Sequence, residues 1–383
     1  MASIERIIEG REIVICAGSG GVGKTTTSAA IALGMAARGY KVCVLTIDPA
    51  KRLADSLGLK ELGNEASKVN PKLLKEQGVD PESGGELWAM MLDAKETFDA
   101  LVARHAEDAE ARDRVLNNRI YQQISGALAG SQEYMAMEKL FELHSEGRFD
   151  LLVLDTPPSR NALDFLDAPQ RLTQFIEGKS LQVFIKPTGF AARVASRGTG
   201  VALSVLKRIV GFDLLADLSE FFTAFSGMID GFQDRAHRVT SLLADDRTSF
   251  LIICGPQSEP IDEAVFFHSK LVENRMNFGG AVVNRVRYRL GSHQVKVKDL
   301  SGRIDRELDD TALAERLARN LAEYDVLAVR DQKNIDELTR ALNGEPVIRI
   351  PYLDTDVHDI AGLCQINEYL FVEEDERVER AIS

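Results

Sequence analysis

A glycine-rich run near the start of the chain limits the possible folds more than any other segment. It consists of Gly18, Ser19, Gly20, Gly21, Val22, Gly23, Lys24 and Thr25, with Thr26 directly after it. Apolar residues 13–17 before the run predict a buried strand, and residues 26–37 after it predict a helix. Glycine, four residues, glycine, lysine and threonine in this setting are typical of a loop that binds phosphates.

The chemistry of such a loop assigns roles to its residues. Backbone N–H groups point inward to a phosphate chain, and the lysine and the hydroxyl reach the phosphates and a Mg²⁺ ion. We therefore expect residues 18–26 to bind nucleotide phosphates, Lys24 to take part in catalysis and Thr25 to ligate Mg²⁺. Residues 18–25 are called the phosphate loop below.

Apolar runs alternate with helical patterns along the chain. The runs are residues 12–17, 41–47, 87–92, 150–154, 249–254, 280–283 and 347–350. Most are apolar throughout, which is typical of a parallel sheet covered on both faces. The pattern predicts an α/β fold with a doubly wound, mostly parallel sheet and helical insertions. Ligands bind such sheets at the carboxyl ends of the strands.

One helical stretch differs from the others in its apolar content. Residues 168–246 carry many large apolar side chains between positions 201 and 232, on more than one helical face. We expect residues 1–167 and 247–383 to form a P-loop NTPase core, and residues 168–246 to form a helical insertion. The apolar segment is either an exposed surface for a client or partner, or the insertion's own core or a constitutive subunit interface.

Composition narrows the class of protein. The 383 residues carry a net charge of -13, which argues against general binding to nucleic acid. We find no signal peptide and no apolar run long enough to span a membrane, so we expect a cytoplasmic protein. The four cysteines form no C-x-x-C pair, and we expect buried thiols rather than zinc ligands or disulfides.

Two acidic motifs follow predicted strands. Asp48 begins Asp-Pro-Ala after residues 41–47, where a carboxylate could orient an attacking water. Asp155 begins Asp-Thr-Pro-Pro after residues 150–154, which is the Walker-B pattern of a carboxylate that supports Mg²⁺. Each motif alone is also an ordinary turn signal. Together with the phosphate loop, they predict a site at three strand ends.

This set of motifs resembles the family of arsenical pump-driving ATPases and tail-anchored-protein targeting ATPases. That family belongs to the deviant-Walker class of P-loop proteins, which also includes MinD and ParA. The resemblance implies ATP and Mg²⁺ as cofactors, with Asp48 and Asp155 in the two switch motifs. It also implies that Asn284, at the end of Val-Val-Asn, contacts adenine, and that Pro351 and Tyr352 pack on the base.

The resemblance implies an ATPase switch that couples dimer closure to a hydrophobic client or a membrane-protein partner. The alternative is a nucleotide-switched positioning regulator of the MinD or ParA type. Arsenite transport is not expected, because the four cysteines do not match the metalloid-binding cysteines of the pumps.

The chain departs from the family in its phosphate loop. Ser19 replaces a signature lysine that reaches the phosphates of a dimer partner, and a hydroxyl cannot supply that charge. Three explanations remain open. A paralogous partner donates the lysine in a heterodimer, a cation such as Lys51, Arg52 or Arg160 replaces it in a homodimer, or hydrolysis is slow and the nucleotide acts as a switch.

Overall fold

The computed structural model describes residues 3–48, 51–77, 79, 84–124, 131–156, 168, 229–289 and 297–382. The chain divides into two compact units. The first contains Met1–Met90, Arg148–Ala162 and Ala244–Ser383, and the second contains Met91–Gly147 and Leu163–Leu243.

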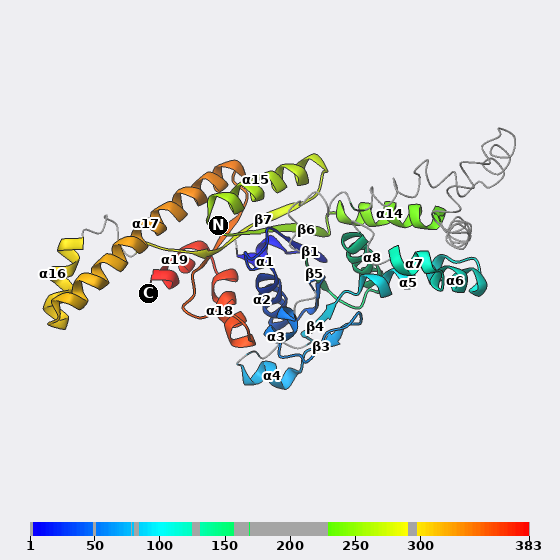
Figure 1. Cartoon of the computed structure of the whole chain (residues 1–383), viewed down its shortest axis with the longest axis horizontal. Helices are drawn as coiled ribbons and strands as arrows, with labels where there is room; N and C mark the ends of the chain where they lie inside the picture. Colours follow the sequence, from blue (N-terminus) through cyan, green and yellow to red (C-terminus); the bar gives the residue numbers. More distant parts are fainter. Residues whose placement is uncertain are drawn as a thin grey trace, which may run out of the picture. The chain divides into compact units, whose positions relative to one another are not determined.

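One eight-stranded sheet organises the first unit (Figure 1). Its strands are β1 (Ile13–Ala17), β2 (Lys41–Thr46), β3 (Ser67–Lys68), β4 (Glu86–Met91), β5 (Leu151–Asp155), β6 (Thr248–Cys254), β7 (Phe278–Val286) and β8 (Val347–Pro351). Their order across the sheet is β3-β4-β2-β5-β1-β6-β7-β8. This arrangement confirms the predicted α/β fold with a mostly parallel sheet. Each of the seven predicted strands is present, and the short strand β3 was not predicted.

The register of the central strands brings their carboxyl ends to one edge. Strand β1 pairs in parallel with β5 and β6, and Cys16 lies opposite Asp155. Strand β2 pairs in parallel with β5, and Thr46 lies opposite the same aspartate. The ends of β1, β2 and β5 are therefore level, and the loops that follow them start side by side.

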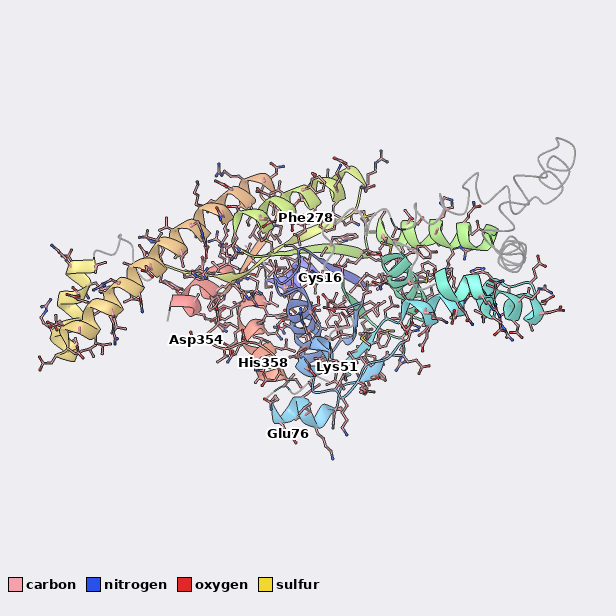
Figure 2. All side chains as sticks on the ribbon, viewed as in Figure 1. Cys16, Lys51, Glu76, Phe278, Asp354 and His358 are labelled. Atoms are coloured by element: carbon pink, nitrogen blue, oxygen red, sulfur yellow. The ribbon has the colours of Figure 1, made fainter. Side chains whose placement is uncertain are left out.

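The central strands form because their residues are apolar on both faces. Every residue of β1 and of β5 is buried, as expected for a parallel sheet covered by helices. Cys16, Cys43 and Cys254 are buried in β1, β2 and β6, which confirms the prediction for these thiols. Figure 2 labels Cys16 where β1 runs through the first unit. Burial raises the pKa of the Cys16 thiol to about 12, so the group stays protonated.

The described helices of the first unit are α1 (Ile4–Ile7), α2 (Lys24–Ala37), α3 (Arg52–Ser56), α4 (Pro71–Glu76), α15 (Ser258–Glu273), α16 (Val297–Leu308), α17 (Thr311–Ala341), α18 (Ile360–Leu370) and α19 (Glu374–Ile382). Helix α16 packs against α17. Helix α2 packs against β2, β5 and α18. Its small side chains allow this close packing, since a Cβ on Gly34 would overlap the Phe371 ring.

The second unit is helical in its described parts. Its helices are α5 (Ala94–His105), α6 (Ala109–Leu116), α7 (Arg119–Ile124), α8 (Ser131–Glu146) and α14 (Ile229–Leu243). Helices α8 and α14 are joined by an ion pair between the buried Glu138 and the partly exposed Arg235, in which Arg235 Nη2 lies 2.6 Å from Glu138 Oε1. Most of the apolar segment expected in the insertion, residues 201–228, lies outside the described residues.

Candidate functional site

The phosphate loop connects β1 to α2, and two of its glycines are required by close contacts. A Cβ at Gly18 would overlap the carbonyl oxygen of Ile253 in the neighbouring strand β6. Gly23 is the N-cap of α2 with a left-handed φ of 95°, and a Cβ there would overlap the side-chain amide of Asn284. The loop therefore passes too close to β6 and β7 for a side chain at either position.

Alanine at Gly18 should destabilise the fold more than alanine at Gly21. The Ile253 oxygen belongs to a backbone in the middle of the sheet and cannot move away, so Gly18→Ala should lower the free energy of unfolding by about 3 kcal/mol. Gly21 has a φ of +78° but open space around its Cβ position, so Gly21→Ala should cost only about 1–2 kcal/mol of backbone strain. Urea unfolding of both variants tests this, and equal losses would contradict the close contact.

Lys24 lies folded onto its own loop. Lys24 is only 6% exposed, and its Nζ donates to the Ser19 carbonyl oxygen over 2.9 Å. Burial lowers the pKa of Lys24, whereas the nearby carboxylates of Asp155 and Asp48 raise it. A buried ammonium whose hydrogen-bond partner among the described residues is a neutral carbonyl is well placed to gain from an anion.

Asp155 ends β5 and holds two hydroxyl groups. Thr25 Oγ1 and Thr46 Oγ1 both donate to Asp155 Oδ2, over 2.6 and 2.8 Å. The other carboxylate oxygen, Oδ1, is buried and has no hydrogen-bond partner among the described residues. Burial raises the pKa of Asp155 to about 6, and the two hydroxyl hydrogen bonds and Lys24 limit the rise. The side chain therefore remains a carboxylate at neutral pH.

These groups fit a hard divalent cation. Mg²⁺ takes oxygen ligands, usually one or two side-chain oxygens together with phosphates and water. The Thr25 hydroxyl and the Asp155 carboxylate are 2.6 Å apart, and Asp155 Oδ1 has no partner in the part of the chain that the structure describes. The two residues predicted as metal ligands thus lie together, with one buried oxygen still unsatisfied.

Asp48 is connected to this pair through Thr46. The backbone N–H of Asp48 donates to Thr46 Oγ1 over 3.2 Å, and the same hydroxyl donates to Asp155. One hydroxyl therefore joins the ends of β2 and β5. The remainder of both acidic motifs, residues 49–50 and 157–167, lies outside the described residues.

Residues at the ends of β7 and β8 lie beside the phosphate loop. Asn284 is buried, and its Nδ2 donates to the Val22 carbonyl oxygen over 3.0 Å. Pro351 ends β8, and Tyr352 after it is 56% exposed. The guanidinium of Arg287 lies 5.4 Å from the Tyr352 ring centroid, within cation–π range. Arg287 in turn forms an ion pair with Asp331 of α17 at 3.3 Å.

A cavity of about 800 Å³ in the first unit brings most of these residues together. Its volume is in the range of about 300–1,000 Å³ found for cofactor sites. Of the predicted site residues, the lining includes Gly20, Gly21, Gly23, Lys24, Thr25, Thr26, Asp48, Asn284, Pro351 and Tyr352. It also includes Arg52, Thr156, Arg285, Leu353, Thr355, Asp356, Val357 and Ile366.

Some predicted residues support the cavity without lining it. Gly18, Ser19, Val22 and Asp155 are not among the lining residues. Ser19 Oγ is buried and has no hydrogen-bond partner within the described ranges, although the Ser19 carbonyl accepts from Lys24. Thr46 and Arg285 were not predicted. Thr46 is a threonine inside a strand, and nothing in the sequence marks it as a partner of Asp155.

A parallel sheet with a glycine loop at β1, a buried lysine at the start of α2 and an aspartate at the end of β5 defines a P-loop NTPase. The comparisons place the chain more narrowly within this class. Residues 11–289 match the family described as anion-transporting ATPase. The chain therefore belongs to the anion-transporting ATPase family.

Several curated proteins are similar to this chain. The ATPase ASNA1 homolog of Plasmodium falciparum is 22% identical and covers 97% of this chain and 91% of its own length. The ATPase GET3 of Kluyveromyces lactis is 26% identical over 71% of each chain. The ATPase GET3 of Malassezia globosa is 31% identical over 47% of this chain and 51% of that protein, about half of each. These matches support the predicted resemblance and do not favour a regulator of the MinD or ParA type.

None of the described helices combines the length and the apolar character that crossing a bilayer requires.

Proposed function

We propose that this chain binds ATP with Mg²⁺ and hydrolyses it. The observation that carries the proposal is the convergence of Lys24, Thr25 and Asp48 on one cavity, with Asp155 bonded to Thr25 beneath it. These four groups come from three separate parts of the sequence, and the level ends of β1, β2 and β5 bring them together. A glycine turn without a ligand would not need this arrangement.

The residues act on the nucleotide in different ways. The backbone N–H groups of residues 20–23 and the start of α2 hold the phosphates, and Lys24 exchanges the Ser19 carbonyl for a phosphate oxygen. Thr25 and Asp155 hold Mg²⁺, which neutralises phosphate charge when it is bound. Asp48 orients the attacking water and accepts its proton.

The proposed switch connects the nucleotide to the rest of the chain. Thr46 Oγ1 forms hydrogen bonds with both Asp155 and the backbone N–H of Asp48. A shift of Asp155 when Mg²⁺ or phosphate is bound or released would therefore move the segment after β2. We expect this movement to accompany closure of a homodimer or of a heterodimer with a lysine-containing paralogue. The client would be a hydrophobic segment or a membrane protein, and residues 201–232 carry the apolar side chains for it.

Arsenite or antimonite is not the proposed ligand. Trivalent arsenic binds thiolates, and Cys16, Cys43 and Cys254 are buried in separate strands. Burial raises the pKa of Cys16 and of Cys254 to about 12 in each case, which keeps both thiols protonated. The fourth cysteine, Cys364, is half-buried on α18, and burial raises its pKa as well.

Lys24→Ala tests the proposal directly. Loss of a charged hydrogen-bond donor to the phosphates should weaken Mg-ATP binding by about ten- to a hundredfold, as measured by titration calorimetry. Lys333→Ala is the matched control, because Lys333 is an exposed lysine of α17, with 75% of its side chain accessible. Unchanged affinity of Lys24→Ala, or an equal loss in Lys333→Ala, would reject the phosphate-binding role.

A further inference from the structure

The end of β7 contacts three consecutive residues of the phosphate loop. Asn284 Nδ2 donates to the Val22 carbonyl oxygen over 3.0 Å, and its Oδ1 accepts from the backbone N–H of Arg285 over 2.9 Å. The Arg285 side chain donates from Nη1 to the Gly21 carbonyl oxygen over 3.3 Å. The Asn284 amide also occupies the space that a side chain at Gly23 would need.

Arg285 adopts an unusual backbone conformation to make this contact. Its φ is 62°, in the left-handed region that glycine favours and arginine rarely adopts. Such a conformation costs about 1–3 kcal/mol and persists where surrounding contacts hold it. At Arg285 these contacts are the Asn284 oxygen on its N–H and the phosphate loop at its guanidinium. The strained residue therefore lies where strand β7 meets the loop.

The contacts from β7 are made to carbonyl oxygens of the phosphate loop, and these contacts help to fix the loop's shape. A phosphate loop works by turning successive N–H groups toward the anion, which leaves carbonyl groups that need other partners. Asn284 and Arg285 supply donors to two of them, those of Val22 and Gly21. A loop held in this shape before binding loses less conformational entropy when the phosphates arrive.

We infer that Arg285 is a positioning residue for the phosphate loop, and that it contributes to nucleotide affinity through the phosphates rather than through the base. The inference rests on the proposed binding of ATP at this loop. It differs from a role in adenine recognition in one measurable way. A residue that recognises the base affects the preference between ATP and GTP, whereas a residue that shapes the loop affects every ligand with a triphosphate.

The test measures binding of ATP, GTP and inorganic tripolyphosphate, each with Mg²⁺, to the full chain and to Arg285→Ala. We expect the variant to bind all three ligands about three- to tenfold more weakly, with the ratio of ATP to GTP affinity unchanged. A variant that loses the preference for ATP while keeping its affinity for tripolyphosphate would overturn the inference. Failure of the unsubstituted chain to bind any of the three would instead reject the proposed function.

Arg285→Gly separates positioning from general stability. Glycine adopts a φ of 62° without strain, so this variant should unfold at a temperature no lower than that of Arg285→Ala. It still lacks the donor to Gly21, so its tripolyphosphate affinity should fall as far as that of the alanine variant. If affinity instead follows the unfolding temperature across the three proteins, Arg285 has only a structural role.

Discussion

Asp48→Asn should slow ATP hydrolysis by about 10²–10⁴-fold while leaving Mg-ATP binding within a few-fold of the parent. The side chain lines the cavity, and its backbone N–H bonds Thr46 Oγ1. Asparagine has the same shape and preserves that backbone contact, but its amide cannot accept a proton from water. Single-turnover phosphate release gives the rate, and titration calorimetry gives the affinity.

A second aspartate controls for the loss of charge near the site. Asp55 lies exposed on α3, seven residues after Asp48, and does not line the cavity. Asp55→Asn should hydrolyse ATP within about twofold of the parent. Parent-like hydrolysis by Asp48→Asn, or an equal loss in both variants, would remove Asp48 from its role.

The trapped Asp48→Asn protein also addresses the missing lysine at Ser19. We would express it tagged in its native host, purify it with Mg-ATP, and identify bound proteins by mass spectrometry. A paralogue that carries the lysine would support the heterodimer. Recovery of the chain alone would favour a homodimer in which a cation such as Arg52, which lines the cavity, supplies the charge. Membrane proteins enriched over an ATP-free control would support a hydrophobic client.

Asp155→Asn should lose Mg²⁺-dependent nucleotide binding and yet stabilise the nucleotide-free fold at pH 7.5. The pKa of Asp155 in the fold is raised to about 6 from its ordinary value of 3.8, chiefly by burial. Ionising it in the fold therefore costs free energy that the unfolded chain does not pay. The cost is absent below pH 3.8, grows as the pH rises to about 6, and is complete above it. At pH 7.5 it is on the order of 3 kcal/mol.

Urea unfolding without nucleotide at pH 4, 5 and 7.5 measures this effect. As the pH rises through this interval, the parent should lose free energy of unfolding relative to Asp155→Asn, so the asparagine variant should become the more stable of the two. Asn can still accept from Thr25 and Thr46, which donate to Asp155 in the parent. Asp55→Asn again serves as the control and should show no such trend. A difference that does not change with pH would contradict the raised pKa.

Much of the fold could be predicted because its strands are long and apolar. The central strands are buried on both faces, and strands in that environment consist of continuous apolar runs, which can be recognised in the sequence. Strand β3 has only two residues, Ser67 and Lys68, and pairs with β4 in the antiparallel direction, so no apolar period marks it. Strand β7 extends beyond the predicted residues 280–283 to Phe278–Val286, since its ends contain arginine and glycine.

The site could be predicted only where a motif marks it. Lys24, Thr25, Asp48 and Asp155 follow recognisable patterns, and the structure brings them to one edge of the sheet. Thr46 and Arg285 follow none, because their roles depend on which strands become neighbours. Thr46 bonds Asp155 only because β2 lies beside β5, 109 residues further along the chain. Arg285 reaches Gly21 across 264 residues of sequence.

The cavity joins segments that lie far apart in the sequence, and this has a consequence for synthesis. The phosphate loop is made well before Pro351, Tyr352 and Val357, which line the same cavity. Translation adds about 5–20 residues per second, so these segments are made tens of seconds apart. A nascent chain therefore has no complete nucleotide cavity until the last lining residue, Ile366, has been made. A ribosome that stalls before β8 would hold a phosphate loop without these later lining residues.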